Sequence, residues 1–169
     1  MTRAFAGHFD SVVGVDIAPS MIRKARELSA GVPGVEYVLN ERPDLAFAPS
    51  GSVDLVYSAI VLQHVGQPYV ARYIAEFVRV LSPRGLAMFQ MPTELSAPRL
   101  PRVLIEAYKT LRFGRRRMQM HALSGDEIKA VVAGAGGAVV RIDESVAADG
   151  SYRSGMYFVR LDKSSPRSQ

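Results

Sequence analysis

The feature that most constrains the fold of this chain is the segment from Val12 to Arg26, VVGVDIAPSMIRKAR. A short valine-rich run ends on Asp16, and two residues later Pro19 opens a stretch in which apolar residues have helical spacing. An apolar run of this kind is typical of a buried parallel strand. Proline is favoured in the first turn of a helix, where its missing N–H is not needed. The segment therefore predicts a parallel strand followed directly by a helix.

Asp16 is the first candidate binding residue. Ligands of parallel α/β sheets bind outside the carboxyl ends of the strands, where an aspartate can accept hydrogen bonds from both hydroxyls of a ribose. A plain strand-to-helix junction with a solvated acid fits the same pattern. In nucleotide-binding units of this kind, a first strand and a glycine-rich turn lie about 20 residues before the ribose acid. Only Met1 to Val15 precede Asp16, and Met1–Phe9 looks like the helix that follows such a turn, so we expect the chain to begin just after that loop.

Composition excludes several classes of protein. The 169 residues fit one domain with a substantial core, and 48% hydrophobic with 22% charged residues is typical of soluble globular proteins. We find no apolar run near the roughly 18 residues that span a bilayer and no secretory signal, and we expect a cytoplasmic protein. The chain has no cysteine, and His8, His64 and His121 lack the mutual spacing of metal ligands, so we expect neither a disulfide nor a metal site.

The formal net charge of +5 is concentrated in one part of the chain. Much of the excess comes from seven basic residues: Arg99, Arg102, Lys109, Arg112, Arg115, Arg116 and Arg117. Such a segment attracts nucleic acid, lipid headgroups or a phosphorylated substrate, or it simply forms a solvated face. We favour the solvated face and expect no nucleic-acid partner, because no aromatic-interleaved binding module accompanies it. Peripheral membrane contact through 99–117 stays open, and the sequence does not indicate an oligomeric state.

Strands and helices alternate through the first half of the chain. The pattern predicts strands at 35–39, 53–57 and 86–91, and a helix over 68–81 whose apolar residues form one stripe. Alternating units of this sort predict a mostly parallel sheet with helices on both faces. Residues 93–122 interrupt the rhythm, and we expect them to form an insertion or lid at the carboxyl edge of the sheet.

The last third of the chain predicts a different pairing. Ser124 and Glu127 have the spacing of a capping box that starts a helix. The glycines at 134–137 follow this helix and precede a strand, which is the reverse of a phosphate loop, so we interpret them as a helix end and turn. Strands at 138–142 and 156–161 have no helix between them and must pair antiparallel. A polar tail at 164–169 then follows a domain of residues 1–163.

Four segments together resemble the class I S-adenosylmethionine-dependent methyltransferase family. They are VVGVDIAPSMIRKARE (12–27), VEYVLNERPDL (35–45), VDLVYSAIVLQHV (53–65) and YIAEFVRVLSPRGLAMF (73–89), and the ending GGAVVRIDE…MYFVRLD resembles the family's terminal hairpin. The resemblance covers residues 1 to about 163 and is weakest at 93–122. It implies a Rossmann-like sheet with a C-terminal antiparallel hairpin and S-adenosyl-L-methionine as cofactor. The family's first strand and glycine-rich loop have no counterpart before Asp16, so we expect an N-terminally truncated form whose activity is in doubt.

The resemblance also implies site residues in the first part of the chain. Asp16 matches the acid that holds the ribose hydroxyls, and Ile17 matches the apolar residue against the adenine. Asn40, Glu41 and Arg42 follow the next strand, where the family contacts the adenine edge, often through an acid, and Glu41 fits that acid. Glu41 also fits a simple solvated loop acid.

Further along, the resemblance places Ser58 and Ala59 on the methionine side of the pocket. His64 is the candidate catalytic residue, as a general base, although a packed histidine that closes the turn fits the apolar run Ile60–Val65 as well. His121 is a second histidine that could reach the same edge of the sheet.

The function that these observations predict is methyl transfer from S-adenosylmethionine to a small molecule. A small acceptor is favoured because the Asn/Asp-Pro-Pro-Tyr type of motif, found in amino-group methyltransferases, is absent and Ser58-Ala-Ile-Val61 stands in its place. The alternative is a non-catalytic methyltransferase-like remnant or a partner-binding domain. A dinucleotide-binding oxidoreductase would use the same acid, but the terminal hairpin and the short chain argue against it.

Overall fold

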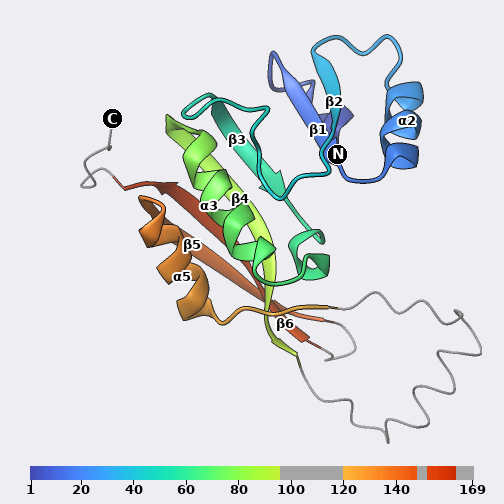
Figure 1. The fold of residues 1–169 in the computed structure, drawn as a ribbon. Coiled ribbons are helices and arrows are strands. Elements are labelled where there is room, and N and C mark those ends of the chain that lie inside the picture. The colour runs from blue at the N-terminus through green and yellow to red at the C-terminus, as the bar shows by residue number, and fades with distance from the viewer. Residues whose placement is uncertain (96–119, 148–151, 163–169) are drawn as a thin grey trace, which may run out of the picture. The chain divides into compact units, whose positions relative to one another are not determined.

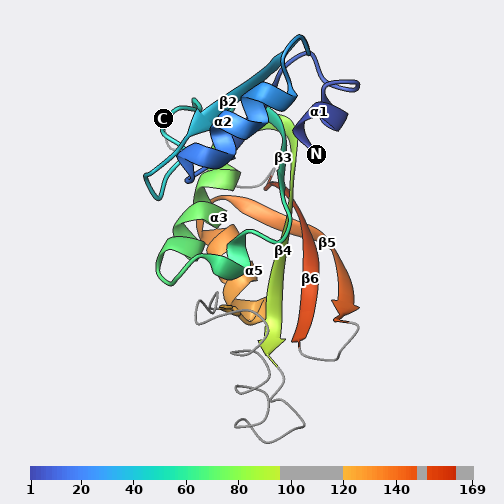
Figure 2. The same cartoon turned by 90° about the vertical axis from the view of Figure 1, so that its right-hand side faces the viewer.

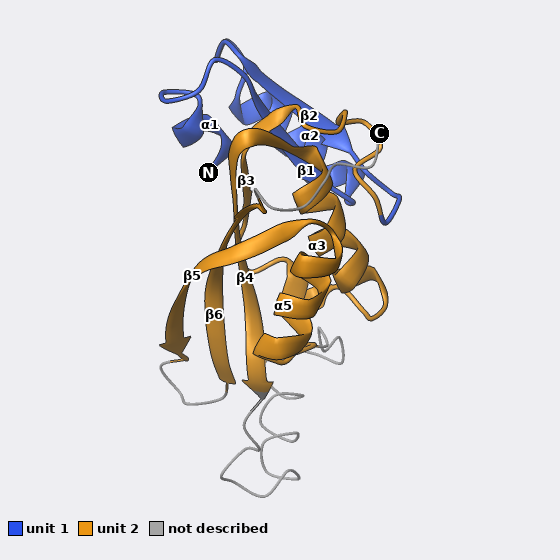
Figure 3. Ribbon diagram, turned by 90° about the vertical axis from the view of Figure 1, so that its left-hand side faces the viewer, with its two compact units in different colours: residues 1–43 blue, residues 44–169 orange. Residues whose placement is uncertain are grey.

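The computed structural model describes residues 1–95, 120–147 and 152–162 (Figure 1). The chain divides into two compact units, residues 1–43 (unit 1) and residues 44–169 (unit 2), and each is described by itself (Figure 3). The described residues form an α/β structure with both parallel and antiparallel strand pairs, which confirms the predicted fold class.

Several sequence predictions fall outside the described residues. The expected lid at 93–122 lies mostly there, and the basic segment at 99–117 and the polar tail at 164–169 lie there entirely. A single domain over 1–163 stays a prediction. In the part of the chain that the structure describes, no helix is long and apolar enough to cross a membrane. The same residues contain no group of three or more histidines or acids placed to hold a metal ion.

Unit 1 is a parallel pair of strands with two helices. Its elements are α1 (Thr2–Phe5), β1 (Val12–Asp16), α2 (Pro19–Leu28) and β2 (Val35–Leu39). The strands pair in parallel from Val12 opposite Val35 to Asp16 opposite Leu39, so both end at the same edge. Pro19 occupies the first turn of α2. The predicted strand–helix–strand unit is therefore confirmed, and no strand precedes β1 in the described residues.

A tight turn leads into β2. Gly31 and Gly34 have φ angles of 81° and 69°, the left-handed region that glycine adopts at little cost. A β-carbon at Gly34 would collide with the carbonyl oxygen of Asp10. The amide of Val12 donates to the carbonyl oxygen of Gly34 over 2.7 Å. This turn thereby joins the entry of β1 to the entry of β2.

The first helix is shorter than predicted. We expected a helix over Met1–Phe9, but α1 ends at Phe5. Met1 provides no side-chain cap, and Gly7 disfavours continuation of the helix by about 1 kcal/mol relative to alanine. The chain instead turns so that the rings of Phe5 and Phe9 meet edge to face, with 6.1 Å between their centroids.

Unit 2 is a four-stranded sheet whose described helices cover one face (Figure 2). Its elements are β3 (Val53–Ser58), the 3₁₀ helix η1 (Leu62–His64), α3 (Tyr69–Val80), β4 (Leu81–Leu95), α5 (Gly125–Gly134), β5 (Gly137–Val146) and β6 (Tyr152–Leu161). The strand order is β3-β4-β6-β5. β3 and β4 are parallel, and β6 is antiparallel to both β4 and β5. The predicted C-terminal antiparallel hairpin is confirmed.

The strand β4 starts earlier than predicted. We expected Ser82–Gly85 to separate the end of the helix from a strand at 86–91. The helix ends at Val80, but strand pairing begins at Leu81, and the register has slipped where Leu86 faces Leu55. The four residues are absorbed as an irregularity in the strand. Gly85 permits this because a β-carbon there would lie only 2.8 Å from the carbonyl oxygen of Val53.

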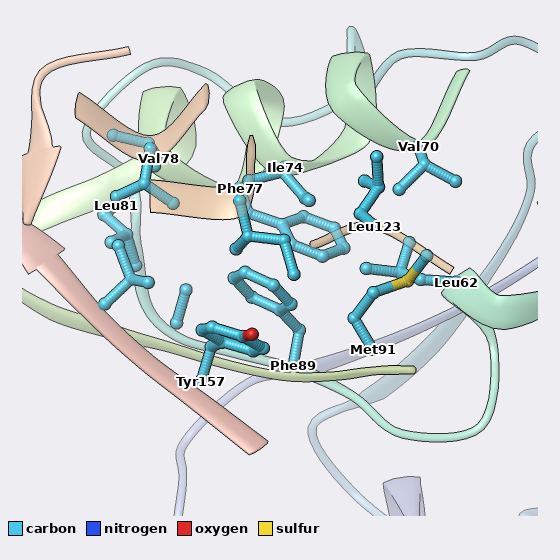
Figure 4. Close-up of a cluster of buried hydrophobic side chains, with 14 of the residues drawn as sticks. Leu62, Val70, Ile74, Phe77, Val78, Leu81, Phe89, Met91, Leu123 and Tyr157 are labelled. Atoms are coloured by element: carbon cyan, nitrogen blue, oxygen red, sulfur yellow. The ribbon is translucent and has the colours of Figure 1, made fainter. Parts of the chain in front are cut away.

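The core of unit 2 lies between the sheet and the two helices (Figure 4). Phe89 lies at its centre, stacked on Tyr157 with 5.5 Å between ring centroids and tilted against Phe77 at 6.0 Å. The other fully buried large side chains are Leu62, Val70, Ile74, Val78, Val80, Leu81, Met91, Ile128, Val132 and Val159. Burial of each such side chain contributes about 1.5–3 kcal/mol. Leu62 belongs to this core, and it therefore anchors η1 beside the carboxyl end of β3.

The start and end of α5 follow the sequence prediction. The hydroxyl of Ser124 accepts from the amide of Glu127 over 3.2 Å, and the carboxylate of Glu127 accepts from the amide of Ser124 over 2.8 Å. This reciprocal pair is the capping box. After the helix, Gly136 has a φ angle of 82°, so the glycines at 134–137 form a helix end and turn.

Candidate active site

The carboxyl edge of unit 1 brings together the candidates from two strand ends. Asp16 is the last residue of β1, and its carbonyl oxygen accepts from the amide of Asn40, the residue after β2, over 2.9 Å. The side-chain oxygen Oδ1 of Asp16 accepts from the amide of Ala18 over 2.8 Å, which fixes the carboxylate at the entry to α2. Among the described residues, Oδ2 has no hydrogen-bond partner. Half of the carboxylate is thus held by the fold, and half is available to a ligand.

The residues next to Asp16 and Asn40 are exposed. Ile17 has 67% of its surface exposed although it is apolar. Asn40 is only 8% exposed, and its Oδ1 lies 3.4 Å from the amide of Arg42, which donates to it. This bond forms the turn on which Glu41 and Arg42 are exposed. An exposed apolar side chain and an acid at one strand edge are suited to the flat face and the amino edge of a purine.

The carboxyl end of β3 in unit 2 contains an unusual backbone conformation. Ser58, its last residue, is buried, and Ala59 is partly buried. Ile60 has a φ angle of +62° and is 64% exposed. This angle is a genuine outlier for a β-branched residue, and such strain of about 1–3 kcal/mol clusters at functional sites. The strained turn lies directly after the strand end where the resemblance places the methionine side of the pocket.

The 3₁₀ helix η1 carries the candidate catalytic residue. His64 is partly buried, and its Nε2 lies 3.1 Å from Nε2 of Gln63. The amide of His121 donates to the carbonyl oxygen of Gln63 over 2.8 Å, so the segment before α5 runs beside η1. A β-carbon placed on Gly66 would lie 4.0 Å from Nε2 of His121. The structure therefore brings His64 and His121 to the same turn, as the sequence allowed.

Gln63 is the residue that the sequence analysis missed. Only 6% of it is exposed, and its Oε1 is buried without a hydrogen-bond partner in the described residues. The only sequence signal was an amide inside the otherwise apolar run Ile60–Val65. That signal does not reveal burial, because the backbone of Gln63 contacts His121, which is distant in the sequence.

A charged cluster on α3 fastens the loop that leads to β3. The guanidinium of Arg79 donates to both carboxylate oxygens of Glu76, over 2.6 and 2.9 Å, and to the carbonyl oxygens of Leu45 and Ala48. Glu76 also accepts from the amide of Leu45 over 2.7 Å. The hydrogen bond from Arg79 is the main reason that the pKa of Glu76 lies below its ordinary value. The cluster holds residues 45–48 against the helix.

A comparison with known proteins identifies the family. Residues 1–89 match a family model described as a methyltransferase domain. An uncharacterized 37.1 kDa protein in transposon TN4556 of Streptomyces fradiae is 36% identical over 81 residues, which are 48% of this chain and 23% of that protein. Malonyl-[acyl-carrier protein] O-methyltransferase of Laribacter hongkongensis is 35% identical over 85 residues, which are 46% of this chain and 28% of that protein. The chain thus matches about a quarter of the length of these relatives.

A solved structure shows the same fold over nearly the whole chain. Magnesium protoporphyrin IX methyltransferase from Synechocystis, with bound SAH, superposes with a TM-score of 0.61 at 18% identity, covering 94% of this chain and 68% of that one. At 18% identity, this likeness shows the fold alone. The family is shown by the family model, which matches more than half of the residues. The chain belongs to the class I S-adenosylmethionine-dependent methyltransferase family.

Proposed function

We propose that this chain binds S-adenosylmethionine and takes part in methyl transfer to a small molecule. The proposal rests on the carboxylate of Asp16. Its Oδ1 accepts a hydrogen bond from the amide of Ala18, and its Oδ2 has no hydrogen-bond partner in the described residues. A carboxylate held in this way is prepared to accept from ribose hydroxyls without reorganisation. Ile17 would lie against the adenine, and Glu41 would accept from its amino group.

The remaining site residues keep the roles that the family resemblance suggests. Asn40 and Arg42 shape the turn beside the adenine edge, and Ser58 and Ala59 line the methionine side. The bound cofactor supplies an electrophilic methyl group, so most of the acceleration comes from proximity and orientation of the acceptor. A general base is needed where the acceptor is a hydroxyl or a protonated amine, and His64 has this role in the proposal.

Methyl transfer to oxygen is supported by one relative. Its printed name, malonyl-[acyl-carrier protein] O-methyltransferase, describes transfer to an oxygen. The small-molecule nature of the acceptor and a cytoplasmic location stay predictions. The non-catalytic alternative predicts that the chain does not bind the cofactor at all.

Isothermal titration of the full chain with S-adenosylhomocysteine tests the proposal. Replacement of Asp16 by Ala should leave the ribose hydroxyls without their acceptor, which costs about 1–3 kcal/mol, or a loss of affinity of about 5- to 150-fold. The matched control is Asp10→Ala, which removes an exposed acid from the same unit and should bind like the parent. Equal affinities of the parent and Asp16→Ala would contradict the proposal, and an absence of binding would favour the non-catalytic alternative.

A further inference from the structure

The outer edge of β5 has no partner strand in the part of the chain that the structure describes. β5 is the last strand in the order β3-β4-β6-β5, with β6 on one side of it (Figure 2). The amide of Ala147, directly after β5, donates to the carbonyl oxygen of Tyr152 over 3.0 Å. Every second residue of an antiparallel strand bonds to its partner in this way, so Ile142, Glu144 and Val146 direct their amides and carbonyls to the outer edge. A row of such groups is a template for pairing with another strand.

The side chains along this edge include an ion pair and two exposed valines. The guanidinium of Arg141 donates to both carboxylate oxygens of Asp143, each over 2.7 Å. The same guanidinium lies over the ring of Phe158, 5.1 Å from its centroid. Val140 and Val146 are 55% and 58% exposed. The edge therefore presents one positive and one negative group in a fixed arrangement, together with apolar surface.

The charges of β5 are complementary to those of a second copy of the same strand. Arg141 and Asp143 lie on either side of Ile142, and the irregularity of β5 lies before Arg141. When two copies run antiparallel about a two-fold axis at Ile142, Arg141 of each copy lies opposite Asp143 of the other. Opposite charges at directly opposed positions stabilise strand pairing, and like charges weaken it. An axis at Arg141 or at Asp143 would place identical charges opposite each other, so the charge pattern selects one register.

The other edge strands of the described structure lack this property. β1, β2 and β3 also have one partner strand each in the described residues. Each of them carries a single charged residue, which is Asp16 in β1, Glu36 in β2 and Asp54 in β3. Antiparallel pairing of two copies of any of these strands cannot place an acid opposite a base. Among the described edges, β5 alone matches a copy of itself in charge.

We propose that two copies of this chain associate through β5, with the two strands antiparallel about a two-fold axis at Ile142. The partner is a second copy, because one patch then supplies both signs of charge and both donors and acceptors of the backbone bonds. The pairing joins two four-stranded sheets into one, and it places the exposed Val146 opposite Ala138 of the second copy. The paired charges lie at the surface, so the association should weaken as the salt concentration rises.

Sedimentation equilibrium of the full chain over a range of protein concentrations tests the proposal. The parent should form a dimer. Arg141→Asp and Asp143→Arg each place like charges opposite each other at two positions, and each should weaken the dimer by about tenfold or more. An equal mixture of the two variants restores opposite charges at both positions and should form a dimer with one copy of each. The control Arg84→Asp makes the same charge change as Arg141→Asp at an exposed position of β4 and should dimerise like the parent.

The outcomes that contradict the proposal are distinct. A parent that stays monomeric overturns it, and so does a dimer that Arg141→Asp weakens no more than Arg84→Asp, since the contact then lies on another surface. A mixture that stays monomeric when each variant alone is monomeric also overturns it. Circular dichroism shows whether each variant folds. If a single variant does not fold, the exchange Arg141→Asp with Asp143→Arg in one chain decides: it keeps every opposite-charge pair and should dimerise, and a folded monomer would overturn the proposal.

Discussion

Replacement of Arg79 by Met should release residues 45–48 from α3 and destabilise unit 2. The guanidinium makes a two-pronged contact with Glu76, over 2.6 and 2.9 Å, and donates to the carbonyl oxygens of Leu45 and Ala48 over 3.0 and 3.1 Å. Removal of the arginine therefore leaves a carboxylate and two carbonyl groups without their donor. Among the described residues, Glu76 then keeps only the hydrogen bond from the amide of Leu45.

The size of the effect follows from the exposure of the pair. Loss of one partner from a fully buried ion pair costs about 3–5 kcal/mol, whereas an exposed pair contributes about 0–1 kcal/mol. The side chains of Arg79 and Glu76 are 32% and 17% exposed, so this pair is intermediate between a fully buried and an exposed ion pair. We expect the free energy of unfolding to fall by about 2–3 kcal/mol. Arg79→Lys keeps the charge but loses the two-pronged contact with Glu76, and it should lower the free energy of unfolding by about 1 kcal/mol.

The loss should also depend on pH. The pKa of Glu76 is lowered in the folded state, chiefly by the hydrogen bond from Arg79. The stabilisation that this shift provides is fully present above the ordinary value of 4.5 and is lost as the pH falls through the lower folded value. The difference between parent and Arg79→Met should therefore be constant near neutral pH and should shrink below pH 4.5.

Urea unfolding followed by circular dichroism, from neutral to acid pH, measures both quantities. The matched control is Lys129→Met, which breaks the exposed pair of Lys129 and Asp126, 3.3 Å apart, and should change stability by less than about 0.5 kcal/mol. The reasoning is refuted if Arg79→Met is no worse than Lys129→Met, or if its cost is the same at all pH values.

Three further predictions concern the local structure and are tested by the same unfolding assay. Ile60→Gly should relieve the strain of the φ angle of +62° and stabilise the protein by about 0.5–1 kcal/mol. The control Val61→Gly, at an ordinary φ of −106°, should destabilise the protein by a similar amount. Equal effects of the two substitutions would contradict the strain assigned to Ile60. Gly34→Ala should cost about 2–4 kcal/mol, because it adds a collision with backbone to an unfavourable φ. Gly31→Ala, with open space around it, should cost about 1–2 kcal/mol, and a cost as large as that of Gly34→Ala would exclude the collision. Ser124→Ala should cost about 1 kcal/mol through loss of the capping box, and an unchanged stability would show that the cap is dispensable.

The parts of the fold that the sequence predicted are those fixed by local chemistry. The bounds of β2 were predicted correctly because a glycine turn precedes it and a polar loop follows it. The start of α5 was predicted because Ser124 and Glu127 satisfy each other within one turn. The extent of β4 was not predicted, because pairing with β3 and β6 continues the strand through a sequence that locally favours a turn.

The candidate site also has features that the sequence predicts and features that it does not. The position of Asp16 beside Asn40 could be predicted, because the carboxyl ends of neighbouring parallel strands meet at one edge. The burial of Gln63 could not be predicted, since the segment that its backbone contacts, at His121, is far away in the sequence. The strain at Ile60 also had no local signal, because isoleucine is among the residues least suited to a positive φ.

The most direct test of the cofactor site is a titration of the ¹⁵N-labelled full chain with S-adenosylhomocysteine, followed through its backbone amide signals. We expect saturable shifts at Ala18, whose amide donates to the carboxylate of Asp16, and at Ile17 and Glu41. The signal of Ile128, in the core of unit 2, should not change. The same shifts should be lost or need much more ligand in Asp16→Ala. Saturable binding that leaves Ile17, Ala18 and Glu41 unchanged, or no binding at all, would contradict the account.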